Sequence, residues 1–333
     1  MVKLLKNNGG VALILTILII SLIVAVTLQF NTSMRSDLHA AVNLRDGIKL
    51  GSIARSGFQC ALAVLYEDAF ENEFDSLHEA WAYTKAISSY SASIFEEGRF
   101  IVEITDLSGR IQLNQLVTLK IDGTWGYNEN QKQLLKRFLS SQEFDLEPDD
   151  VDDIIDAIRD WIDPDDDQTE FGAENSYYQS LEPSYSCRNG TFKELEELLL
   201  VKGITKELFY GTMEKPGISN YLSVYGNGEI NINTADPLVL ASLHDEIDEE
   251  RAQEMVAYRE DEENDLSKIG WYKTALGTNE DIIDPKMITT GSTHFEISSE
   301  GFKETISKRV TGIVERKGQE KEKTLTILSW KTL

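Results

Sequence analysis

Carboxylates crowd one short stretch of the chain, residues 160–174, which reads DWIDPDDDQTEFGAE. Carboxylates that alternate along a tight loop can converge on one point, and a later glutamate can close the shell around a cation. Hard oxygen ligands of this kind favour calcium over zinc or copper. The sequence therefore predicts a calcium-binding loop. Its predicted ligands are Asp160, Asp163, Asp165, Asp166, Asp167 and Glu174.

The spacing of these carboxylates partly matches the calcium loop of an EF-hand. Counted from Asp163, the ligand positions of that loop fall on residues 163, 165, 167, 169 and 174. Three departures argue against a true EF-hand. Gln168 replaces the expected glycine at the sixth position, Phe171 stands at the ninth, and Pro164 stiffens the start of the loop. Two other interpretations stay open. The loop can be a solvated acidic segment after a helix, or its paired carboxylates can carry out acid–base chemistry.

Composition narrows the classes of function. The 333 residues include 32 lysines and arginines against 57 acidic residues, which gives a formal net charge of −25. Such a chain repels phosphate backbones, so no nucleic-acid partner is predicted. The four histidines are scattered and form no cluster with cysteine, so zinc is not predicted. Cys60 and Cys187 can form one disulfide outside the cytoplasm, or stay apart as two free thiols.

The elements that must hold the acidic loop form a helical middle segment between two sets of strands. Residues 99–106 and 110–116 alternate in polarity and predict a hairpin with its turn at 107–109, after a helix at 76–89. Three further strands are predicted at 294–301, 305–316 and 323–330, the last two joined by a polar turn at 317–322. Strands, then helices, then strands indicate an α+β core interrupted by a large all-α insertion, residues 128–285.

Two segments of the insertion resemble helix-hairpin-helix units. Residues 228–259 form the clearer unit, in which Asn233 and Thr234 are the predicted helix cap, and residues 192–209 form a partner. In DNA-binding versions a glycine-rich bend holds a phosphate on its backbone N–H groups. Here the bend at residues 244–250 lacks glycine and is strongly acidic. We therefore expect the hairpins to act in packing.

The N-terminus carries an apolar segment with small residues in front of it. Residues 11–30 contain no charged side chain, and about twenty apolar residues span a bilayer. Lys3 and Lys6 precede the segment, which favours a cytoplasmic N-terminus. A secretory signal peptide places its small-residue cleavage site after the apolar part, whereas here Gly10 comes directly before Val11. The other interpretation is an ordinary membrane anchor. Helical spacing continues to residue 66, which predicts one long helix.

Three motifs together resemble one family. They are the GVALI start at residues 10–14, the DWIDPDD…GAE…YY run at 160–178, and ININ-TA at 230–235. The chain is similar to the minor pseudopilin K of type II secretion systems over nearly its whole length. Major pilins and most pseudopilins carry glutamate at the fifth mature position, and the K subunit lacks it. Counted from Val11, the fifth residue here is Leu15.

The resemblance implies a pilin-like fold, α+β, with a long N-terminal helix packed on an antiparallel sheet. It implies a non-enzymatic subunit at the tip of the periplasmic pseudopilus, in complex with the minor pseudopilins I and J. It also implies cleavage and methylation by the prepilin peptidase at Gly10 and Val11, calcium in the helical domain, and a single inner-membrane span with a periplasmic head. A minor pilin of a type IV pilus and a membrane-anchored DNA-uptake receptor are the alternatives.

The predicted divisions of the chain follow from these assignments. Residues 1–10 are the leader, 11–30 the transmembrane helix, and 31–127 the first part of the pilin-like core. Residues 128–285 are the helical insertion with the calcium loop. Residues 286–333 are the C-terminal strands of the core.

Overall fold

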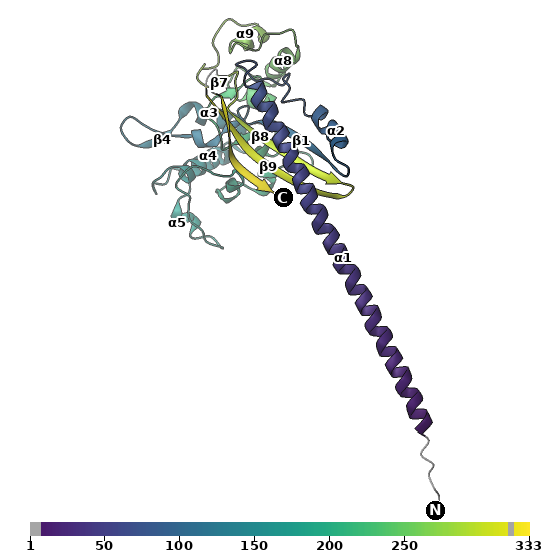
Figure 1. Cartoon of the computed structure of the whole chain (residues 1–333). Coiled ribbons are helices and arrows are strands. Elements are labelled where there is room, and N and C mark those ends of the chain that lie inside the picture. Colours follow the sequence, from purple (N-terminus) through teal and green to yellow (C-terminus); the bar gives the residue numbers. More distant parts are fainter. Residues whose placement is uncertain (1–7, 319–322) are drawn as a thin grey trace, which may run out of the picture.

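The computed structural model describes residues 8–318 and 323–333, and its dominant element is one long helix, α1 (Asn8–Asp68). The N-terminal half of α1 projects as a rod beyond a folded head, and its C-terminal half lies on the head (Figure 1). In the described part of the chain this is the one helix long and apolar enough to cross a membrane, and its apolar part is not buried in the protein. The prediction of one continuous helix is confirmed.

The sheet beneath α1 has four antiparallel strands in the order β1-β8-β9-β10. Its first strand, β1 (Arg99–Asp106), comes from the N-terminal part of the chain. The other three are β8 (His294–Lys303), β9 (Ile306–Lys317) and β10 (Thr324–Thr332). These three match the predicted C-terminal strands. The predicted turn between the last two lies largely outside the described residues.

The predicted hairpin at residues 99–116 is wrong. Strand β1 pairs with β8, and its other edge is covered by α2 (Lys85–Ile94). The Ser91 hydroxyl accepts a hydrogen bond from the N–H of Phe100 at 3.1 Å, and the Ser88 hydroxyl accepts one from the N–H of Val102 at 3.1 Å. These serines occupy backbone groups that a hairpin partner would need. The following segment forms β2 (Ile111–Gln112), which pairs in parallel with β5 (Leu222–Ser223).

The helix predicted at residues 76–89 begins later than expected, at Lys85. Residues 76–83 form turns instead. The Glu79 carboxylate accepts hydrogen bonds from the Ser76 N–H at 2.9 Å and the Trp81 indole N–H at 3.0 Å. This local folding competes with helix formation in the segment.

Helix α1 packs on the sheet through one helical stripe. The stripe recurs every three or four residues and is fully buried, and it meets β1, β8 and β9 in the first of two hydrophobic cores. Gly57 lets the backbones approach, because a Cβ there would lie 2.8 Å from Cγ of Phe100. The stripe consists of Leu50, Ile53, Ala54, Phe58, Ala61 and Leu65.

The insertion has its own hydrophobic core and consists mostly of short helices. Short strand pairs run through it and along its borders, so it is not purely α-helical as predicted. The pairs are β2–β5, β3 (Val117–Leu119) with β4 (Trp125–Tyr127), and β6 (Ile230–Asn231) with β7 (Ile288–Thr289). The helices are α3 (Glu129–Leu139), α4 (Pro148–Ile162), α5 (Asn175–Tyr178), α6 (Lys206–Tyr210), α7 (Pro237–Ala241), α8 (Glu249–Glu260) and α9 (Trp271–Ala275).

Helices α7 and α8 form the predicted hairpin at residues 228–259. The cap of α7 is Asp236, whose carboxylate accepts from the N–H of Leu238, and not the predicted Asn233 and Thr234. Asn233 is buried and its amide donates to the Leu266 carbonyl instead. The partner segment is the 3₁₀ turn η2 (Leu195–Leu200) followed by α6.

Cys60 and Cys187 are free thiols, so the disulfide that the sequence allowed is not formed. Cys60 lies half-buried on α1 against the core beneath that helix. Cys187 is buried in the core of the insertion. The two residues therefore belong to different cores.

Two glycines of α1 give a matched test of how closely this helix packs on the sheet. We expect Gly57→Ala to lower the free energy of unfolding by about 1–3 kcal/mol, because the new methyl group overpacks the contact with Phe100. Gly51→Ala meets nothing within 4 Å and should raise stability by up to about 1 kcal/mol through helix propensity. Thermal unfolding of the full chain in detergent measures both. Equal effects of the two substitutions would contradict the close approach at Gly57.

Candidate metal centre

Helix α4 presents carboxylates on one face and apolar side chains on the other. Pro148 opens the helix, and Asp149 and Asp150 in its first turn complement the helix dipole. Asp156 and Asp160 are four residues apart and therefore share a face. The opposite face is buried in the core of the insertion and contains Val151, Ile154, Ile155, Ile158 and Ile162.

Three of the predicted ligands converge at the end of α4. Asp160 lies in its last turn, Asp163 follows its last residue, and Glu174 precedes α5. Each offers a carboxylate oxygen, and these oxygens all lie within 4.8 Å of one another. Asp160 and Asp163 are 0% exposed and Glu174 is 2% exposed. The loop thus brings three acidic groups together in a site closed to solvent.

The oxygens of Asp163 and Glu174 are buried without hydrogen-bond partners among the described residues. The nearest cation is Arg159, whose Nε lies 3.4 Å from Oδ2 of Asp163. Leaving a buried charge unpaired costs several kcal/mol. The donor set therefore fits a hard divalent cation, because each of the three carboxylates offers one oxygen to a common point.

The Asp160 carboxylate also organises the loop that follows it. Thr169 donates to it from its hydroxyl at 2.7 Å and from its backbone N–H at 3.2 Å. Gly172 lies so close that a Cβ there would overlap the Asp160 carboxylate. Any larger residue at position 172 would push the loop away from Asp160.

The remaining predicted ligands, Asp165, Asp166 and Asp167, are exposed on the loop outside the buried cluster. Asp165 accepts a hydrogen bond from the N–H of Asp167 at 3.0 Å. Asp166 accepts from the side-chain amides of Asn175 at 2.7 Å and Asn189 at 3.0 Å. The buried cluster therefore keeps only the first and last positions of the EF-hand spacing, Asp163 and Glu174, and takes its third residue, Asp160, from the preceding helix.

Burial and mutual repulsion shift the ionisation of the cluster. Desolvation, followed by the Asp165 charge, raises the pKa of Asp163 to about 7 against the opposing effect of Arg159. Desolvation, followed by Asp160 and Asp163, raises the pKa of Glu174 to about 8. Both groups hold protons more tightly in the folded chain than in the unfolded one.

Several residues that hold the loop were not predicted from the sequence. Asn175 also accepts a hydrogen bond from the N–H of Cys187 at 2.9 Å, and the Asn189 amide donates to the Asp165 carbonyl at 2.8 Å. Lys202 donates to the carbonyl of Phe171 at 2.8 Å. No charge or spacing pattern signals these contacts, since polar residues that support a loop resemble any other surface polar residue.

The fold and its single apolar helix define a membrane-anchored, pilin-like subunit. Two family models, each described as type II secretion system (T2SS), protein K, match residues 109–212 and residues 230–270. The first match contains the acidic loop, and the second contains α7 and α8. Both matches are to protein K of the type II secretion system, and they confirm the resemblance drawn from the motifs of the chain.

Relatives match over most of the chain. The type II secretion system protein K of Pseudomonas aeruginosa is 27% identical over 306 residues, which is 89% of this chain and 85% of that protein. The protein K of Aeromonas hydrophila is 27% identical over 245 residues, or 72% of this chain and 70% of that protein. A chain of the crystal structure of the GspK-GspI-GspJ complex from enterotoxigenic Escherichia coli shares the fold, with a TM-score of 0.65 and 17% identity over 90% of this chain and 98% of that chain.

The raised pKa values of Asp163 and Glu174 predict that the stability of the fold depends on pH in the presence of excess chelator. Between the unfolded pKa values of about 4 and the folded values of about 7 and 8, the folded state binds more protons than the unfolded state. The contribution of these two groups to stability is therefore full below about pH 4 and should fall steadily as the pH rises towards 8. Melting temperatures measured at several pH values test this. The double variant Asp163→Asn with Glu174→Gln should show a smaller fall, and an equal fall would mean that other groups cause it.

Proposed function

We propose that this chain is the minor pseudopilin that forms the tip of a type II secretion pseudopilus and supports protein export. The observation that carries the proposal is the pilin-like helix on its sheet, joined to a head that two protein K family models match. This match favours a secretion pseudopilus over a type IV pilus or a DNA-uptake receptor. The chain acts as a structural subunit and not as an enzyme.

The size of the head supports a position at the end of the filament. The insertion carries its own core beside the sheet core, so the head is much bulkier than a helix and a sheet alone. Leu15 gives the same indication, because a glutamate at that position would pair with the N-terminal amine of a neighbouring subunit in the filament. A subunit without this charge needs no such neighbour above it.

The minor pseudopilins I and J are the proposed partners. The solved complex that shares this fold contains GspK, GspI and GspJ. On α1, Leu38 and Leu44 precede the part of the helix that packs on the head, and Ile48 lies at the start of that part. They are 63%, 68% and 66% exposed, respectively. Apolar side chains spaced along one exposed helix suit packing against the N-terminal helices of other subunits.

The N-terminus supports a proposal for processing. Cleavage by the prepilin peptidase between Gly10 and Val11 would leave the apolar part of α1 as the mature N-terminus, where methylation follows. Lys3 and Lys6 favour a cytoplasmic leader, which supports a head in the periplasm and one span in the inner membrane.

Calcium is the cation proposed for the site made by Asp160, Asp163 and Glu174. Buried oxygens without partners, the hard donor set and the mutual spacing within 4.8 Å support this choice. An ion bound only by the folded head would stabilise it by mass action. It would also fix the loop between α4 and α5 against the core.

A pair of glutamates in the same loop tests the calcium proposal. We expect Glu174→Gln to weaken calcium binding by at least tenfold and to reduce the rise in melting temperature that calcium produces, because a buried ligand charge is lost. Glu170→Gln is the control, since Glu170 is exposed and outside the cluster. Calcium titration and thermal unfolding of the full chain measure both effects. A wild-type melting curve that excess chelator leaves unchanged would remove the proposal.

Substitution of exposed leucines tests the proposal that the minor pseudopilins I and J are partners. We expect Leu44→Asp to reduce co-purification of the I and J subunits by tenfold or more, because it places a charge on the proposed helix-packing surface. The melting temperature of the chain alone should stay the same. Leu77→Asp is the control, since Leu77 is also exposed but lies in the segment after α1. Full recovery of both partners with Leu44→Asp would contradict the proposed surface.

A further inference from the structure

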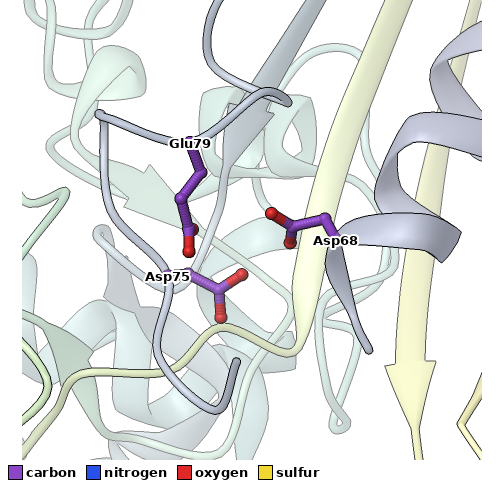
Figure 2. A group of neighbouring side chains, drawn as sticks. All are labelled: Asp68, Asp75 and Glu79. Carbon is purple, nitrogen blue, oxygen red and sulfur yellow. The ribbon is translucent and has the colours of Figure 1, made fainter. Parts of the chain in front are cut away.

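A second group of carboxylates lies where α1 ends, far along the chain from the acidic loop. Asp68 is the last residue of α1, and Asp75 and Glu79 belong to the segment that connects α1 to α2. Figure 2 shows the three side chains directed towards one another. Each offers a carboxylate oxygen, and these oxygens all lie within 4.8 Å of one another.

Two oxygens of this group are buried without a partner. Asp68 is 5% exposed and Asp75 is 1% exposed, yet Oδ1 of each carboxylate has no hydrogen-bond partner in the described ranges. Both carboxylate oxygens of Glu79, in contrast, have hydrogen-bond partners. Oε1 accepts from the side-chain amide of Asn72 at 2.6 Å, and Oε2 accepts from the Ser76 backbone N–H and the Trp81 indole N–H. Buried carboxylate oxygens without a partner are stabilised when a cation or a proton binds them.

Among the residues that the structure describes, one cation lies within direct reach of the group. Arg316 of β9 donates to Oδ2 of Asp68 at 3.1 Å and to Oδ2 of Asp75. Lys323 approaches the same segment, but its ammonium donates to the backbone carbonyls of Ala69 and Asn72. Three carboxylates against one guanidinium leave two negative charges in the group, which is the charge that a divalent cation neutralises.

The surroundings leave room for such an ion and its water. A cavity of about 440 Å³ lies on the Asp75 side of the group. Of the three carboxylates Asp75 lines it, together with Ser292, Arg316 and Lys323, among others. Calcium takes six to eight oxygen ligands at about 2.3–2.6 Å, so ligand oxygens on opposite sides lie about 4.8 Å apart. Water from the cavity can complete a shell that the three carboxylates begin.

We propose that Asp68, Asp75 and Glu79 bind a second divalent cation, calcium by the nature of its ligands, at the end of α1. This site is separate from the cluster of Asp160, Asp163 and Glu174 in the insertion. The ion joins the end of α1 to the segment after it and, through Arg316, to β9. It therefore stabilises the part of the head that holds the membrane-anchored helix.

Equilibrium dialysis of the detergent-solubilised full chain against radioactive calcium tests this proposal. We expect two ions per wild-type chain and one in the double variant Asp163→Asn with Glu174→Gln. Adding Glu79→Gln to that double variant should remove the remaining ion. Glu79→Gln leaves both carboxylate partners of Arg316 in place, and circular dichroism checks that the variant is folded. Glu71→Gln, an exposed residue of the same segment, should change nothing.

The outcomes separate this proposal from the one for the acidic loop. One ion in the wild-type chain and none in the loop double variant would overturn the second site and leave the first intact. Two ions in the wild-type chain that persist with Glu79→Gln and with Asp68→Asn would also overturn it. One ion in the wild-type chain that is lost with Glu79→Gln and kept in the loop double variant would support the second site and contradict the first.

Discussion

The packing of the C-terminal half of α1 against the sheet is the constraint on which the rest of the molecule depends. One helix carries both the apolar segment and the stripe that fills the core beneath it, so the position of the head relative to a membrane is set by a continuous rod. Close approach at Gly57 and at Gly301, whose Cβ position faces the backbone of Leu50, holds helix and sheet together.

The second constraint is negative charge. A chain with a formal charge of −25 cannot pair its acidic residues internally, and most of them lie at the surface. Two groups are instead buried, one at the end of α4 and one at the end of α1. Both lie where a helix stops and the chain must turn. Cations at these two places would fix the segments that connect helices to the cores.

The sequence predicts the elements whose signals are local. Periodic apolar residues without proline predict α1, and alternation predicts β8, β9 and β10. The partner of β1 was mispredicted, because it depends on serines of α2 that cover the strand edge. A sheet edge is free or covered only in the folded chain. The local pattern of residues 99–116 is therefore compatible with a hairpin that never forms.

The candidate metal centre, like the strands, was predictable from the sequence only where its signal is local. The acidic loop was found from composition, but the three buried residues could not be distinguished from the exposed Asp165, Asp166 and Asp167, because burial depends on how the loop packs on the core. The carboxylates at the end of α1 gave no signal at all. Asp68 and its partner Arg316 are separated by 248 residues, and only the sheet brings them together.

The most direct test of the central claim is the mass and N-terminal sequence of the protein isolated from its own membranes. The claim is that α1 becomes the exposed N-terminal helix of a processed pseudopilin. The account predicts a mature chain that begins at Val11 and carries one added methyl group. An intact Met1, or cleavage after the apolar segment of residues 11–30, would contradict it and leave an ordinary anchored or secreted protein.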